Sequence, residues 1–112
     1  MKNRIKINKS VENILSNYSW IINDIKTRNK MKKSVSSILI SEKKKFNIQD
    51  YRVIMDQSNN PSSVINSNSG VLETHIKQNE IWYVNTFTIM PNGGMSCKTQ
   101  KRKDSINKIF ES

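Results

Sequence analysis

The apolar residues change their period at residues 46–60, which read FNIQDYRVIMDQSNN. Within this stretch Tyr51, Val53 and Met55 fall on one face of an extended chain, and the residues between them fall on the other. The Asp, Ser and Asn residues that follow are typical of a turn. The stretch therefore predicts a strand that begins near Tyr51 and ends in an Asn-rich loop.

The residues before this strand have the spacing of two helices. From Arg4 to Tyr18 apolar positions recur at intervals of three and four, although Ser10 is an alternative cap for a shorter helix. A second helix is expected to begin after Asn23 or Asp24, with Thr27 as a rival cap. The apolar positions are Ile7, Val11, Ile14, Leu15 and Tyr18 in the first helix, and Met31, Val35, Ile38 and Leu39 in the second.

Two more strands are expected after the loop, from Val71 to Lys77 and from Glu80 to Met90. The last strand carries Trp82 on one face and Tyr83 and Phe87 on the other, whereas a half-exposed strand would alternate more cleanly. We therefore expect it to be central, with helices on one side and a further layer, such as a neighbouring subunit, on the other. The predicted fold is α+β, with two N-terminal helices packed on a small mixed β-sheet and extended terminal arms.

Length and composition exclude several classes of protein. The 112 residues suffice for one domain, and no apolar run approaches the ~20 residues of a membrane span. The basic N-terminus lacks the apolar core of a signal peptide, so neither a membrane nor secretion is expected. One cysteine, Cys97, and one histidine, His75, make neither a disulfide framework nor a metal cluster. With no glycine-rich phosphate loop and no support for a Cys97–His75 pair, we expect no enzyme activity and no cofactor.

The charge balance points to acidic partners. Lys and Arg number 19 against 9 Asp and Glu, which gives a formal net charge of +10 at pH 7. Basic runs at residues 43–45 and 98–103 could contact phosphates, so a small basic nucleic-acid-binding protein is the alternative function. The lysines form no single stripe in the sequence, however, and no aromatic interleaving, helix-turn-helix or zinc pattern accompanies them. An acidic neighbouring protein explains the charge equally well.

Four pieces of sequence then follow one another in an order that is similar to a known family. They are Asn23-Asp24 with Thr27-Arg28; Tyr51-Arg52-Val53-Ile54-Met55-Asp56 with Asn59-Asn60 and Val64-Ile65; Thr74-His75-Ile76-Lys77; and the strand Ile81 to Ile89. In this order they resemble the C-terminal core domain of contractile phage tail sheath proteins, the myophage tail sheath family. The chain departs from the family at Gln78, where a proline is usual, at Trp20-Ile21-Ile22, and after Pro91. It also lacks the outer domains of the much longer family members.

The resemblance implies a structural protein of the virion without catalytic activity. Such a short chain would be a minor sheath, a sheath initiator near the baseplate, or a collar at a tail end. It would polymerise around the tail tube as rings or a helix, by exchange of β-strands between neighbours. The implied partners are further copies and other tail proteins, namely the tube, the sheath and the baseplate or neck. Assembly would take place in the host cytoplasm and the product would lie in the phage tail.

The same resemblance implies a division of the chain into three parts. Residues 1–9 are an N-terminal arm or helix start, residues 10–90 are the sheath-core-like α+β domain, and residues 91–112 are a basic C-terminal arm. The strand from Glu80 to Met90 is the expected receiver of a neighbour's arm. The expected interface residues are Trp82, Tyr83, Phe87, Ile89, Lys98, Lys101, Arg102 and Lys103. We expect the polar motif residues, including Asp56, Asn59 and Asn60, to shape turns and caps rather than form a reactive site.

Overall fold

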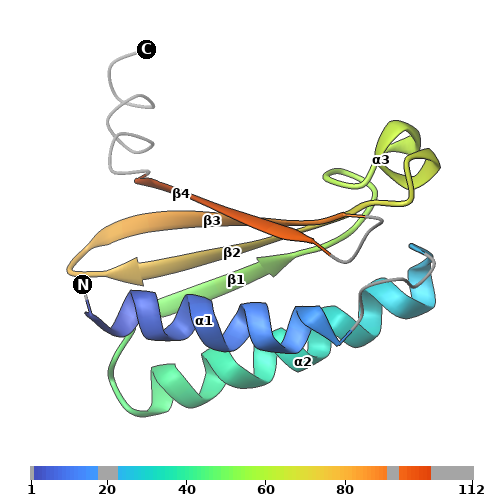
Figure 1. Ribbon diagram of the computed structural model, residues 1–112. Helices are drawn as coiled ribbons and strands as arrows, with labels where there is room; N and C mark the ends of the chain where they lie inside the picture. Colours follow the sequence, from blue (N-terminus) through green and yellow to red (C-terminus); the bar gives the residue numbers. More distant parts are fainter. Residues whose placement is uncertain (1, 18–22, 91–93, 102–112) are drawn as a thin grey trace.

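Two antiparallel helices lie side by side beneath one face of a four-stranded sheet (Figure 1). The computed structural model describes residues 2–17, 23–90 and 94–101. Its elements are α1 (Lys2–Ser16), α2 (Ile25–Lys44), β1 (Asp50–Ile54), α3 (Ser62–Asn66), β2 (Gly70–Gln78), β3 (Ile81–Ile89) and β4 (Met95–Lys101). The predicted α+β fold with two N-terminal helices on a sheet is confirmed. No helix in the described parts of the chain is long and apolar enough to cross a membrane.

The sheet has the order β1-β2-β3-β4, and every neighbouring pair is antiparallel. The expected mixed sheet is therefore wrong. Asn79 and Glu80 join β2 to β3 as a two-residue turn, and both have the positive φ (52° and 64°) that such hairpin turns favour. A parallel neighbour would instead need a crossover of a dozen or more residues, which the short links between β2, β3 and β4 do not provide.

The two expected arms are partly regular structure. Residues 2–9 belong to α1, so the helix start applies and the extended N-terminal arm does not. Residues 95–101 form β4, which pairs along β3 from Met95 to Lys101. Because β2 and β4 flank β3, this strand is central as expected, but neither of its sides is open to a neighbour's arm. Residues 102–112 lie outside the described part of the chain.

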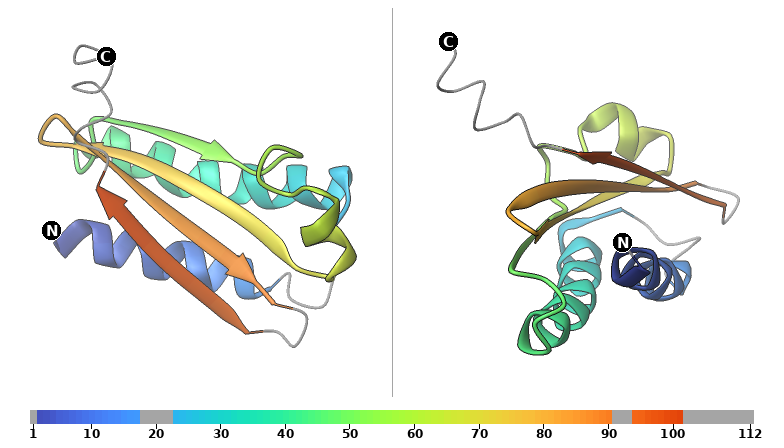
Figure 2. Two further views of the ribbon diagram at one scale, coloured as in Figure 1. Left: turned by 90° about the horizontal axis from the view of Figure 1, so that it is seen from above. Right: turned by 90° about the vertical axis from the view of Figure 1, so that its left-hand side faces the viewer.

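The helices and the sheet form two layers (Figure 2), and one apolar core lies between them. α2 lies along the β1 and β2 side and α1 lies along the β3 and β4 side. The main buried residues are Ile7, Val11 and Leu15 of α1, Met31, Val35 and Leu39 of α2, and Val53, Leu72, Ile76, Phe87 and Ile89 of the sheet. Phe87 and Ile89 are therefore core residues and not the interface residues that the sequence suggested.

A row of polar side chains crosses this core between α1 and the sheet. Asn85 is fully buried on β3; its Oδ1 accepts from Asn8 Nδ2 at 3.2 Å and from Thr99 Oγ1 at 2.8 Å. Its Nδ2 donates to Thr74 Oγ1 at 3.1 Å. Because buried polar groups are costly without partners, this row fixes how α1 sits on β2, β3 and β4.

Replacing Phe87 distinguishes a core residue from an interface residue. Phe87→Ala should lower the free energy of unfolding by about 3–5 kcal/mol, because it removes a fully buried ring and leaves a cavity. Trp82→Ala is the matched control, since Trp82 lies half-buried on the opposite face of β3 and should cost less. Urea unfolding measures both changes. Equal costs for the two variants would contradict the assignment of Phe87 to the core.

Candidate functional site

The first motif piece caps the start of α2. Asp24 has an extended backbone (φ −122°), and its Oδ1 accepts a hydrogen bond from the Thr27 main-chain N at 2.8 Å. The bond satisfies one of the free N–H groups at the helix start, so Asp24 is the cap and Thr27 is not. Hydrogen bonds from Thr27 are the main cause that lowers the pKa of Asp24 below its ordinary value.

The second motif piece shapes the turn that follows β1. Asn59 Oδ1 accepts from the Asp56 main-chain N at 3.0 Å, and Asn59 Nδ2 donates to the Ile54 carbonyl at 2.9 Å. Asp56 Oδ1 accepts from the Ser58 main-chain N at 2.8 Å. Hydrogen bonds from Ser58 lower the pKa of Asp56, whose carboxylate is exposed. In this loop, side-chain atoms therefore supply the hydrogen-bond partners that main-chain groups would have in a sheet.

Asn60 joins this turn to the start of β2. Its side chain is fully buried. Asn60 Oδ1 accepts from the Val71 main-chain N at 2.8 Å, and Asn60 Nδ2 donates to the Val71 carbonyl at 2.8 Å and to the Asp56 carbonyl at 3.1 Å. One amide side chain thus bonds both main-chain groups of Val71, as a neighbouring strand would.

Asn23 brings the two motif pieces together. Asn23 Nδ2 donates to Asn60 Oδ1 at 2.9 Å, across 37 residues of sequence, and to the Ser69 carbonyl at 2.8 Å. Asn23 Oδ1 accepts from Arg28 Nη1 at 2.8 Å, and the Arg28 side chain is buried with 4% of its surface exposed. We call Asn23, Arg28, Asp56, Asn59 and Asn60 the asparagine joint, because they connect the start of α2, the end of β1 and the start of β2.

The sequence assigned Asn23, Asp56, Asn59 and Asn60 to local turns or caps and Arg28 only to the family motif, and the contact between them was missed. The only sequence signal for that contact is the order of the motif pieces itself. The apolar motif residues pack in other places: Val53 is buried and Tyr51 is half-buried against the core, while Val64 and Ile65 are half-buried in α3. Arg52 is exposed on the opposite face of β1.

The remaining interface candidates are scattered over the sheet. Trp82 and Tyr83 are half-buried on opposite faces of β3, and Lys98 is exposed on β4. Lys101 is the last residue of β4, and Arg102 and Lys103 lie outside the described residues. Unpaired strand edges are found at β1 and β4, so these two strands replace β3 as the places where a neighbour could add a strand.

The positive charge is concentrated in the helices. α1 and α2 contain eleven basic and two acidic residues, a formal +9 of the chain's +10. Lys26, Lys30 and Lys33 follow one another at helical spacing and are exposed on α2. Like charges at this spacing repel, so they weaken the isolated helix by a few tenths of a kcal/mol per pair, about 0.2–0.5. The folded chain thus has a basic helical layer that the sequence did not reveal as a stripe.

The nucleophilic and metal-ligating residues do not converge. His75 pairs in register with Val84 on the sheet face turned away from the helices, and its Nε2 lies 3.0 Å from Glu73 Oε1. Cys97 faces the helices, where burial raises the pKa of its thiol. The sheet therefore separates Cys97 from His75. In residues 2–17, 23–90 and 94–101, no group of three His, Cys, Asp or Glu side chains is placed to hold a metal ion.

The asparagine joint predicts a large effect of a small substitution. Asn60→Ala should lower the free energy of unfolding by about 2–4 kcal/mol, because both main-chain groups of Val71 lose buried partners. Asn66→Ala is the control, since Asn66 is exposed at the end of α3 and should change stability by less than about 0.5 kcal/mol. Urea unfolding of both variants tests the joint. A cost for Asn60→Ala no larger than the control would refute it.

The Asp24 cap predicts a specific pH dependence. Its pKa is lower in the folded chain than its ordinary value of 3.8, so its ionised form adds stability above that value. This contribution disappears as the pH falls through the lowered pKa, whereas Asp24→Asn keeps a neutral cap at every pH. The stability difference between the wild type and Asp24→Asn should therefore shrink below pH 3.8. Denaturant midpoints measured over the acid range check this, and a constant difference would contradict it.

Comparison with known proteins gives no relative: no family model matches the chain, and neither does any curated protein or solved structure.

Proposed function

We propose that this protein is a structural, non-enzymatic subunit of a contractile phage tail, with a sheath-core-like domain. It would serve as a minor sheath, sheath initiator or tail-end collar. The observation that carries the proposal is the Asn23–Asn60 hydrogen bond of 2.9 Å. It joins two motif pieces that define the family resemblance and that lie 37 residues apart. This contact supports the interpretation that the resemblance concerns one structural element and not separate matches of a biased composition.

The sheet edges supply a mode of assembly. β1 and β4 each present main-chain N–H and C=O groups on one side, and an extended segment of another subunit can pair with such groups. The resulting bonds do not depend on side-chain charge, which suits copies that each carry +10. Residues 102–112 follow directly on β4 and are the proposed arm. Copies would join through these edges, and other tail proteins would be the further partners.

A second candidate function, nucleic-acid binding, is favoured by one specific observation. The two helices carry a formal +9, and Lys26, Lys30 and Lys33 are exposed at helical spacing on α2, so these three lysines share one surface. A basic layer of this kind can neutralise several phosphates, and its affinity for DNA or RNA would fall steeply with salt. α2 itself contains no aromatic side chain that could stack on bases, and the exposed aromatic ring beside it is Phe46, just after its C-terminal end.

Truncation after β4 tests the proposed arm. The expected arm, residues 91–112, includes β4, so only residues 102–112 are deleted. This deletion retains β4 and should leave the urea midpoint of the monomer unchanged. Negative-stain microscopy should show rings of the full-length protein, or decoration of added bare tail tubes, and neither with the truncated chain. Unchanged decoration by the truncated chain would exclude residues 102–112 as the arm.

Binding to tail tubes or to DNA distinguishes the two candidate functions. A dispersed protein that ignores tail tubes but shifts duplex DNA in a salt-dependent gel assay would overturn the tail proposal. In that case Lys30→Glu with Lys33→Glu, on the helical layer, should weaken the shift far more than Lys77→Glu with Lys98→Glu on the sheet. Equal effects of the two double variants would exclude the helical layer as the DNA-binding surface.

A further inference from the structure

Phe46 is exposed at the end of α2 in a backbone conformation that disfavours it. Its φ is +63°, and 92% of its surface is exposed. The Phe46 main-chain N donates to the Lys43 carbonyl and the Asn47 N to the Glu42 carbonyl, both at 3.0 Å. These two bonds close a helix in the Schellman arrangement, whose left-handed residue is usually glycine. A bulky residue there costs energy, and the ring of Phe46 regains nothing within the monomer.

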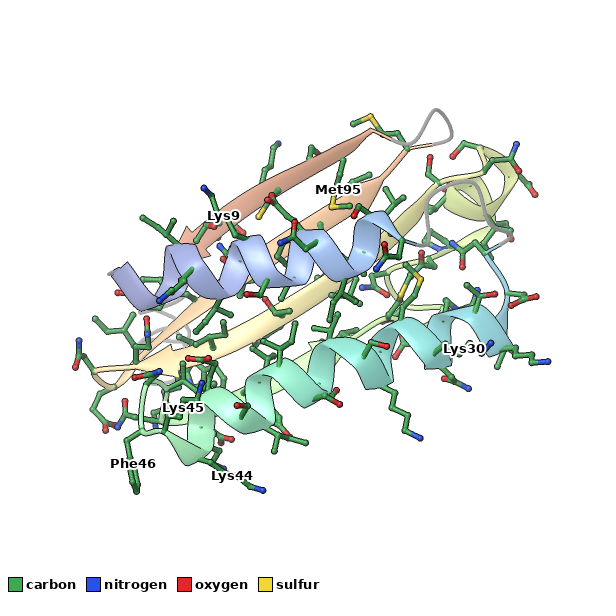
Figure 3. All side chains as sticks on the ribbon, turned by 60° about the horizontal axis from the view of Figure 1, so that its bottom comes forward. Lys9, Lys30, Lys44, Lys45, Phe46 and Met95 are labelled. Atoms are coloured by element: carbon green, nitrogen blue, oxygen red, sulfur yellow. The ribbon has the colours of Figure 1, made fainter. Side chains whose placement is uncertain are left out.

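The ring projects away from the body of the molecule beside the lysines that end α2 (Figure 3). Lys43 Nζ lies 3.4 Å from Asp50 Oδ1, and Lys45 Nζ lies 3.9 Å from Glu42 Oε2, so acidic partners offset part of their charge. Lys44 is exposed in the last turn of α2. This corner thus offers an aromatic ring next to a cation, which is a usual composition for an anchor in a protein interface.

A hollow of about 480 Å³ lies at the opposite end of the same helix. It is lined by Ile25, Arg28, Asn29, Met55, Asp56, Gln57 and Ser58. Its exposed apolar side chain is Ile25, while Met55 and Arg28 form the floor with only 3% and 4% of their surfaces exposed. Ile25 at this hollow is itself a large apolar residue with 64% of its surface exposed.

We propose that Phe46 of one copy binds in this hollow of the next copy, with Lys44 facing the carboxylate of Asp56. The exposed Asp56 carboxylate is ionised at neutral pH like any aspartate, so the contact pairs opposite charges. Five large hydrophobic residues are exposed in the described part of the chain, and Phe46 is the aromatic one among them. The hollow offers an apolar surface on which its ring can pack. The contact buries both Phe46 and Ile25.

The position of the two surfaces dictates the kind of assembly. Ring and hollow lie at opposite ends of a 20-residue helix, about 30 Å apart along its axis. The contact is heterologous when each copy uses its corner on one neighbour and its hollow on another. The reciprocal alternative, in which two copies exchange rings across a two-fold axis, would place two basic α2 helices side by side, and like charges disfavour it. Heterologous contacts produce closed rings or open helices. The inference deepens the proposed function by naming a surface between copies, but it can be tested without any tail component.

Two complementary variants test the contact. Phe46→Asn removes the ring and suits a positive φ, so the monomer should be as stable as the wild type or more so. Ile25→Ser weakens the hollow, and Ile40→Ser is the control at another exposed apolar position of α2 (41% exposed). In sedimentation velocity at about 0.3 M salt, which screens the net charge, the wild type should self-associate. Phe46→Asn and Ile25→Ser should each raise the Kd of self-association about tenfold or more, and Ile40→Ser should not.

A mixture of the two defective variants gives the decisive result. Phe46→Asn keeps its hollow and Ile25→Ser keeps its ring, so when both variants also lack residues 102–112, the proposed arm, the mixture should form a one-to-one dimer that grows no further. A monomeric wild type, association unaffected by Phe46→Asn, or no dimer in the mixture would each overturn the inference. A protein that decorates tail tubes but is monomeric without them would refute this contact alone. One that self-associates through Phe46 but ignores tubes would refute the tail proposal alone.

Discussion

The buried amide of Asn60 is the constraint on which the arrangement of α2 and the sheet depends. Between β1 and β2 the chain leaves the sheet through a turn and α3, and the main-chain groups at the start of β2 need partners there. Asn60 supplies them to Val71, and its Oδ1 also accepts from Asn23. Since Arg28 holds the Asn23 side chain, the start of α2 is fixed against the sheet. Met31, Val35 and Leu39 of α2 can then enter the core in register with β1 and β2.

A core on one face of the sheet has consequences for the outer surfaces. The helices bury their apolar stripes, so nearly all of the chain's net charge lies in one layer. Copies that approach with their helical layers facing one another would repel. Contacts that avoid this repulsion are main-chain pairing at β1 or β4 and burial of an isolated apolar side chain such as Phe46. Main-chain pairing gains energy from groups without a net charge, and the Phe46 contact gains it from an apolar ring together with the opposite charges of Lys44 and Asp56.

The elements that could be predicted from the sequence are those whose apolar periodicity or capping residues are local. α2, its Asp24 cap and the two strands β2 and β3 follow from patterns of three to four and of two residues. β4 was missed because Met95–Lys101 is mostly polar and becomes a strand only by pairing with β3. The antiparallel direction of all strands and the Asn23–Asn60 contact depend on where distant segments meet, which no local pattern contains. The positive φ of Phe46 was missed because glycine or asparagine normally marks such a position.

The two proposed contacts between copies point in different directions. In the structure α1 and α2 run roughly along the strands, so the ring and hollow at the ends of α2 would connect copies along this direction (Figure 1). The β1 and β4 edges lie on opposite sides of the sheet and would connect copies across it. Each contact joins two different surfaces, so when it is used on successive copies it extends the assembly in one direction. Contacts in two directions make a mesh, and a mesh that curves on itself gives rings stacked around a central tube. Such a mesh needs only one small α+β domain per subunit, because its connections come from strand edges and a single aromatic side chain.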